Sequence, residues 1–387
     1  MRHARRVSLL LLAAVACARA VRAEDLPRGT IIDDVTCAGD PAQSYALYLP
    51  STYTPAQAWN LLLGFHPAAR GRAIVEKYRD AAERYGYIVA ASNTSRNGPM
   101  AAAAASVRAM SLDLGQRFSI DADRLYLTGL SGGARVAMQV ALGNDRIAGV
   151  IASSAGYPDA RPRSSVSFPV FGTAGTDDFN YLEMRQLDRA LTSPHYVAIF
   201  NGGHTLPPDA VALEAIEWME IQAMKSGRRR RDEALIDRLL EKRRARIAES
   251  PSPTAADHLL EALAADFTVL RDVAAETARA KELAGRTDVK KALGRERRAD
   301  EAEARRLEQI FELEAGLRDP ERHDQSLGRL REELSRYAQL AAAEPDSPER
   351  SQARRLLRTI SGAAAERVDD ADYRALLDRI APRGRQP

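Results

Sequence analysis

Residues 129–133 read GLSGG, a serine surrounded by glycines. It follows an apolar run at 125–128 that predicts a short buried strand, and it precedes a run at 134–138 that predicts the start of a helix. A sharp strand-to-helix turn lifts the hydroxyl of its central serine clear of a sheet. Glycines two positions before and two positions after that serine let the chain segments approach closely. Ser131 is therefore a candidate nucleophile.

Strands and helices alternate outward from this turn over residues 28–225. Strand-like runs lie at 45–49, 61–65, 87–91, 149–152, 168–171 and 196–200, and helical periods lie at 71–85, 101–118, 132–142, 181–191 and 210–224. Such alternation predicts a mainly parallel sheet covered by helices on both faces. The predicted fold class of residues 24–225 is therefore α/β.

A serine nucleophile needs a base, and residues 24–225 offer His66, His195 and His204. Active sites of parallel sheets lie beyond the carboxyl ends of the strands. His195 precedes the run at 196–200 and is expected at the opposite edge of the sheet, whereas His204 follows that run. The sequence therefore predicts His204 as the base, and the two glycines before it let the loop turn back toward the serine.

A carboxylate that orients the base is expected after the run at 168–171. Two adjacent candidates follow that run, Asp177 and Asp178. If Asp178 serves as the acid, Asp177 is free to cap the helix that begins near Tyr181.

Two backbone N–H groups are predicted to bind an oxyanion. The helix after Ser131 points its free N–H groups at a developing negative charge, which favours the N–H of Gly132. A second donor is expected in the loop after 61–65. Pro67 has no N–H, so Ala68 is the predicted donor. His66 is interpreted as a packed strand-end residue, with polarisation of this loop as the alternative.

These motifs resemble the α/β-hydrolase superfamily, and within it the compact bacterial branch related to polyhydroxybutyrate depolymerases, feruloyl esterases and dienelactone-type hydrolases. The resemblance covers roughly half the chain, up to about residue 225, and its matching segments are 45–50, 65–67, 129–133, 175–178 and 202–204. One departure is Pro67, where such enzymes often have glycine after the histidine. That departure affects the expected oxyanion geometry and leaves the fold and the triad unchanged.

The resemblance implies a triad of Ser131, Asp178 and His204 in that order along the chain. It favours Asp178 over Asp177, because related enzymes place the acid three residues after the glycine of a Gly-Thr turn. It also implies hydrolysis of a small-molecule or polymer ester through an acyl-enzyme. This chemistry requires no metal or organic cofactor, and no metal-ligand spacing of histidines, cysteines and carboxylates is evident.

Two other functions use the same sequence features. A serine peptidase or a thioesterase would carry the same triad. Alternatively, the hydrolase module is degenerate and the helical part of the chain binds a protein partner. The net charge of +3 and the interleaving of acidic with basic residues argue against a nucleic-acid partner.

The composition changes at residues 226–231, which read SGRRRR. Beyond them alanine, leucine, arginine and glutamate dominate, and prolines separate the helical periods. The sequence predicts a basic linker at 226–231 and a charged all-α domain at 232–387, with a faint resemblance to tetratricopeptide-like repeats. The arginine run is interpreted as a solvated linker rather than as a binding patch.

The chain begins with basic residues and a short apolar run, which predicts a secretory signal peptide at 1–23. The run is too short to span a bilayer. A lipoprotein box that ends at Cys17 is one alternative and would attach the protein to a membrane; a buried N-terminal helix is another. The protein is expected in the periplasm or outside the cell, with Cys37 as a structural cysteine.

Overall fold

The apolar runs of the first half of the chain form one eight-stranded sheet in the computed structural model, which describes residues 26–159, 161 and 163–380. The strands are β1 (Ile31–Cys37), β2 (Asp40–Tyr48), β3 (Trp59–Phe65), β4 (Tyr87–Ser92), β5 (Ile120–Leu130), β6 (Ile147–Ser153), β7 (Val170–Gly175) and β8 (His195–Phe200). Five of the six strands from β3 to β8 are buried along most of their length, as expected for strands covered on both faces.

The strand order is β1-β2-β4-β3-β5-β6-β7-β8. The β1–β2 and β2–β4 pairs are antiparallel, and every other pair is parallel. With a serine at the turn between β5 and the following helix, this is the α/β-hydrolase fold. The predicted fold is confirmed.

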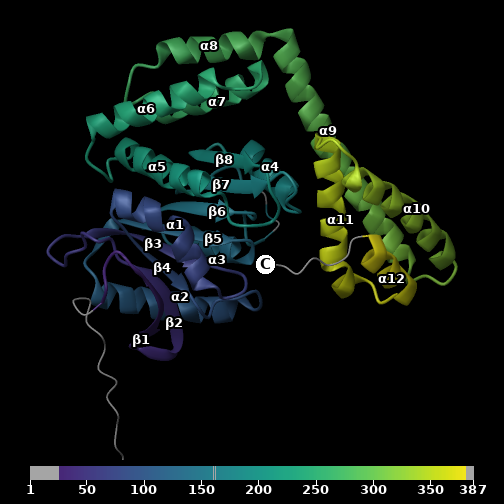
Figure 1. Cartoon of the computed structure of the whole chain (residues 1–387), viewed down its shortest axis with the longest axis horizontal. Coiled ribbons are helices and arrows are strands. Elements are labelled where there is room, and N and C mark those ends of the chain that lie inside the picture. The colour runs from purple at the N-terminus through teal and green to yellow at the C-terminus, as the bar shows by residue number, and fades with distance from the viewer. Residues whose placement is uncertain (1–25, 160, 162, 381–387) are drawn as a thin grey trace, which may run out of the picture.

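Five helices cover the two faces of the sheet (Figure 1). Helices α2 (Met100–Arg117), α3 (Gly132–Leu142) and α4 (Tyr181–Ala190) contribute to one apolar cluster. Helices α1 (Gly71–Tyr85) and α5 (Asp209–Lys225) contribute to a second cluster. Alternate residues of β3 enter the two clusters, so the sheet separates two cores.

Each predicted strand and helix is present, but some bounds differ: β2 begins five residues before the predicted start, and β5 extends beyond the predicted run at both ends. Helices α1 and α3 have the predicted bounds, and β7 begins two residues later than predicted. Strand β1 was not predicted. Its pairing with β2 shifts register between Ile32 and Val35, and such an irregularity removes the period-two pattern that identifies a strand.

The second half of the chain is helical, as predicted, and its helices form two groups. The first group is α6 (Glu233–Ala248), α7 (Pro253–Phe267) and α8 (Ala274–Gly285). The long helix α9 (Thr287–Gly316) leads to the second group, α10 (His323–Ala342), α11 (Pro348–Arg367) and α12 (Ala371–Ile380) (Figure 1). Each group has its own apolar cluster, and the first cluster also contains Ile221 and Met224 of α5.

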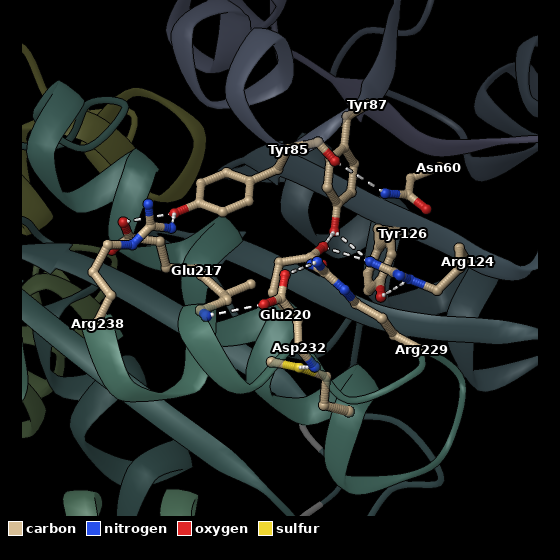
Figure 2. A network of polar contacts seen from close by, with 12 residues as sticks. Asn60, Tyr85, Tyr87, Arg124, Tyr126, Glu217, Glu220, Arg229, Asp232 and Arg238 are labelled. Carbon is tan, nitrogen blue, oxygen red and sulfur yellow. Dashed lines mark hydrogen bonds and ion pairs between the residues drawn. The ribbon is translucent and has the colours of Figure 1, made fainter. Parts of the chain in front are cut away.

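The predicted linker is not simply solvated, because Arg228, Arg229 and Arg231 bond to other parts of the protein. Arg229 forms an ion pair with the fully buried Glu220 of α5, which also pairs with Arg124 of β5 and accepts from the hydroxyl of Tyr87 (Figure 2). A polar cavity of about 520 Å³ is lined by this network. Because Tyr87 begins β4, the network lies at the opposite end of the sheet from Ser131.

The predicted signal peptide at 1–23 and the lipoprotein box at Cys17 lie outside the described residues. Among the helices that are described, none combines the length and the apolar character needed to cross a bilayer. Cys37 is buried, and burial raises the pKa of its thiol to about 11, which fits the expected structural role.

Candidate active site

Ser131 occupies a strained turn between β5 and α3. Its φ of 54° and ψ of −122° are unusual for a residue other than glycine. A Cβ at Gly129 would lie 2.3 Å from the carbonyl carbon of Gly133, and a Cβ at Gly133 would lie 2.1 Å from the oxygen of Phe65. Only glycine fits at these two positions, which explains the GLSGG pattern. Ser131 is the N-cap residue of α3, yet its side chain makes no capping hydrogen bond.

Asp178 and His204 meet beyond the ends of β7 and β8. The Nδ1 atom of His204 lies 2.7 Å from Oδ1 of Asp178, whose side chain is fully buried. The ring of Phe179 stacks on the imidazole at 3.8 Å between centroids. An imidazole whose Nδ1–H is held by a carboxylate presents Nε2 as its acceptor, the tautomer that a general base requires.

The loops that carry this pair are packed backbone against backbone. A Cβ at Gly175 would lie 2.3 Å from the oxygen of Gly202. The N–H of Thr176 donates to the oxygen of Phe200, and the N–H of Asp177 donates to Gly202. The loop that carries Asp178 (residues 176–178, the acid loop) and the loop that carries His204 (residues 201–204, the base loop) are therefore joined through their backbones as well as through these two side chains.

Ser131 lies at the same rim of the sheet as this pair. Its N–H donates to the oxygen of Ser153 at the end of β6 (2.8 Å). The next residue, Ser154, points its hydroxyl at the oxygen of Thr205, which follows His204. The structure thus brings the candidate nucleophile, base and acid to one rim of the sheet, after β5, β8 and β7, with β6 between β5 and β7. Within the described residues, the Ser131 hydroxyl and the His204 ring form no hydrogen bond with each other.

Asp177 has a role that the sequence did not predict. It does not cap α4, whose N-cap is Asn180 without a side-chain capping bond. Its Oδ2 atom pairs with Arg354 of α11 at 3.1 Å, while its Oδ1 atom is buried without a hydrogen-bond partner. The two adjacent carboxylates therefore face different groups, Asp178 toward the base and Asp177 toward the helical region.

The N–H of Ala68, predicted as an oxyanion donor, donates instead to Nδ1 of His66 at 3.1 Å. His66 is buried, and burial lowers the pKa of its imidazole to about 4, so the ring is neutral and accepts this bond. His66 is packed, as predicted, and its ring accepts the hydrogen bond of the Ala68 N–H. The predicted role of Ala68 as an oxyanion donor is therefore not seen, because its N–H is already engaged.

Gly132 begins α3 beside the side chain of Asn97. A Cβ added at Gly132 would lie 1.8 Å from Oδ1 of Asn97, so this glycine is needed for the close approach. His195, which was expected at the far edge, is the first residue of β8, and its ring nitrogens contact the carbonyl oxygens of Ser193 and Asp188. His204 therefore lies at the rim that holds Ser131, and His195 does not. His66 follows β3 at the same rim, but its Nδ1 atom accepts from Ala68.

Three arginines of α11 reach the acid loop, and sequence reasoning missed all of them. Arg354, Arg355 and Arg358 contact Thr176 or Asp177. They lie in a helix that is charged along its length, so no local pattern distinguishes them. Among the described residues, no three histidine, cysteine or carboxylate side chains are grouped as metal ligands.

No known protein family and no curated protein is similar to this chain in sequence. Among solved structures, the chain is similar to a feruloyl esterase module from Clostridium thermocellum (15% identity, TM-score 0.39, 48% of this chain and 85% of that chain). It is also similar to an S-formylglutathione hydrolase from Staphylococcus aureus (17%, 0.38, 50% and 98%) and to a Pyrobaculum calidifontis esterase (13%, 0.38, 52% and 86%). Likeness at this level assigns no activity.

Proposed function

We propose that this protein is a serine hydrolase that cleaves carboxylic esters through an acyl-enzyme. The observation that carries the proposal is the Asp178–His204 hydrogen bond at the rim where Ser131 occupies its strained turn. A buried carboxylate, an imidazole and a serine hydroxyl that makes no capping hydrogen bond, all at one rim of the sheet, are the groups that acyl transfer needs.

The reaction begins with proton transfer from Oγ of Ser131 to Nε2 of His204. The oxygen attacks the ester carbonyl carbon, and the electron pair of the C=O bond moves to its oxygen. The N–H of Gly132, at the start of α3, stabilises that negative charge. Asp178 holds the imidazole in place and stabilises its cation.

Collapse of the tetrahedral intermediate breaks the bond to the alkoxide oxygen, which leaves as an alcohol with the proton from His204. Water then attacks the acyl-enzyme and gives its proton to His204. A second collapse releases the carboxylic acid and returns the proton to Ser131. The neutral, buried His66 takes no part in these proton transfers, because its Nδ1 atom is engaged with Ala68.

The test combines covalent labelling with hydrolysis of a short-chain aryl ester. A fluorophosphonate probe is expected to label Ser131, and Ser131→Ala is expected to abolish both labelling and turnover. Asp178→Asn keeps the side-chain shape and should lower kcat by about 10⁴-fold, because the amide favours the wrong tautomer of His204. Ser193→Ala, at the opposite end of β8, is the matched control and should retain full activity.

The outcomes also separate the competing functions. A Ser131→Ala variant with undiminished turnover would defeat the assignment. Faster turnover of an amide or a thioester than of the oxygen ester would identify a peptidase or a thioesterase that uses the same residues. A wild-type protein that the probe does not label would favour a degenerate module whose helical region binds a protein partner.

We also infer that the protein acts outside the cytoplasm, as the basic and apolar residues of 1–16 indicate. The mass of the mature protein tests this inference. Cleavage before Glu24 is expected, whereas a lipid-modified Cys17 would place the enzyme on a membrane.

A further inference from the structure

Helix α11 of the helical region runs beside the loop that carries Asp178 (Figure 1). Nη1 of Arg354 lies 3.1 Å from Oδ2 of Asp177, and Nη1 of Arg358 donates to the carbonyl oxygen of Asp177 at 2.8 Å. Arg355 donates to the carbonyl oxygen of Thr176. The two residues that precede Asp178 therefore receive three contacts from one helix.

These contacts complete the backbone hydrogen bonding of Thr176 and Asp177. The N–H groups of Thr176 and Asp177 are held by Phe200 and Gly202 on the β8 side. Their carbonyl oxygens are held from the other side by α11. Buried backbone groups need partners, and here the partners on one side come from α/β residues and on the other side from the helical region.

Arg355 is itself fixed in orientation. It is 8% exposed, and Glu303 of α9 binds its Nε and Nη2 atoms at 3.0 Å and 2.5 Å. Its guanidinium lies over the ring of Tyr181 at 4.2 Å from the centroid. A buried ion pair adds little net stability after desolvation, but two parallel hydrogen bonds fix a guanidinium in one geometry. Arg355 therefore holds Thr176 from a rigid support.

Arg358 also approaches the base loop. A Cβ built on Gly203 would lie 2.8 Å from its Nη1 atom, so the guanidinium packs against the backbone immediately before His204. One helix thus contacts both loops that supply the acid–base pair.

We propose that α11 is a positioning element of the active site, in which Arg354, Arg355 and Arg358 hold the turn at 176–178 where Asp178 meets His204. The proposal rests on the proposed function and gives the helical region a part in it. The arginines act through Asp178 and do not touch the reacting atoms. Without these arginines the turn keeps its bonds to β8 and its own bonds through Gly175, Asn180 and Tyr181, but the carbonyl oxygens of Thr176 and Asp177 lose their partners on α11. We expect the carboxylate of Asp178 then to shift relative to the imidazole.

The experiment compares Arg355→Met with Arg189→Met. Arg189 of α4 pairs with Asp300 of α9 at 2.6 Å, so it belongs to the same interface but does not touch the turn. Arg355→Met should lower kcat on an aryl ester by about 10- to 100-fold with KM changed less than about two-fold, since a misplacement of about 1 Å can have this effect. Arg189→Met should keep the wild-type kcat, and Arg355→Lys should recover part of the loss.

A second readout needs no substrate. The Nδ1 proton of His204, held by Asp178, is expected to give a low-field proton NMR signal, which should weaken or shift in Arg355→Met and stay unchanged in Arg189→Met. If Arg355→Met does not fold, Arg354→Gln and Arg358→Gln take its place, because each removes one contact to the turn. Their kcat and NMR signal are then compared with those of Arg189→Met. These two side chains are more exposed than Arg355.

The proposal is overturned if Arg355→Met keeps the wild-type kcat and NMR signal, or if Arg189→Met loses as much as Arg355→Met does. Failure of the proposed function looks different. In that case the wild-type protein neither hydrolyses esters nor reacts with the probe, while the NMR comparison still reports whether α11 positions the pair.

Discussion

The two helical groups have similar compositions but attach to the sheet region in different ways. Helices α6–α8 share an apolar cluster with Ile221 and Met224 of α5, and the buried Asp266 of α7 accepts from Trp218 in α5. Helices α10–α12 reach the sheet region through the guanidinium groups of α11. The first group extends the core, and the second contacts the candidate active site. Two helical groups with similarly charged sequences therefore make different kinds of contact with the sheet region.

The largest expected effect comes from cutting the chain on either side of the first group. A chain that ends after Gly227 would expose Trp218, Ile221 and Met224, which are buried here. We expect this chain to be insoluble or unfolded, because a large apolar face would meet water. A chain that ends after Arg286 keeps α6–α8 and should be soluble with one cooperative thermal transition.

Soluble yield and near-ultraviolet circular dichroism during heating measure this difference. A stable, cooperative protein from the shorter chain would show that residues 24–225 form an independent domain, as the change in sequence composition at 226 predicts. The same result would mean that the first helical group is not part of the core of the sheet region.

The buried carboxylate of Asp266 tests how firmly the first helical group is attached to α5. Asp266 accepts hydrogen bonds from Nε1 of Trp218 at 2.9 Å and from Nε2 of Gln222 at 2.8 Å, and all three groups are buried. Asp266→Ala leaves two buried donors without partners and should lower the free energy of unfolding by about 3 kcal/mol. Urea titration measures the change. Asp266→Asn keeps one acceptor oxygen and should lose less.

Asp237→Ala is the matched control, since it removes an exposed ion pair with Arg271 from the same helical group. Its effect should be much smaller than that of Asp266→Ala, because solvent screens an exposed ion pair. Equal losses from Asp237→Ala and Asp266→Ala would mean that the first group is attached no more firmly than a surface ion pair.

Much of the fold was predictable because the signals are local. The helix at 71–85 ends at Gly86, which adopts the left-handed conformation that glycine favours. The GLSGG turn predicted the conformation around Ser131, because close backbone contacts on both sides exclude larger residues there. The parallel sheet then located His204 at the right rim, since a strand ends just before it.

What could not be predicted depends on contacts between distant parts of the chain. Asp177 and Asp178 are neighbours in sequence, and only the approach of His204 and Arg354 assigns them different partners. The Ala68 donor was chosen by eliminating Pro67, but the neighbouring ring of His66 competes for the same N–H. Arg355 lies 177 residues after Asp178, and a helical charge pattern says nothing about which loop it reaches.

The smallest effects that we expect concern the pH dependence of stability, which should differ between the sheet region and the second helical group. Burial lowers the pKa of His66, in the sheet region, to about 4. Between about pH 6.5 and pH 4 the unfolded chain binds a proton there and the folded chain does not, so the sheet region loses up to about 3 kcal/mol as the pH falls. In the second helical group, hydrogen bonds to Asp324 and Asp370 raise the pKa of His323. Its contribution is fully present below about pH 6.5 and is lost as the pH rises through the folded-state value.

The free energy of unfolding, measured from pH 4 to pH 8, should therefore rise with pH in the contribution of His66 and fall with pH in the contribution of His323. His66→Gln keeps an acceptor for the N–H of Ala68 but does not titrate, so it should reduce the acid-side loss. His323→Gln should remove a small stabilisation that the wild type has at low pH and have little effect at pH 8. If the sheet and the second helical group unfold in separate transitions, each variant should change the pH dependence of its own transition only. If both variants change the pH dependence of one shared transition, with opposite signs, the two parts unfold as one unit. That result would contradict the different modes of attachment seen for the two helical groups.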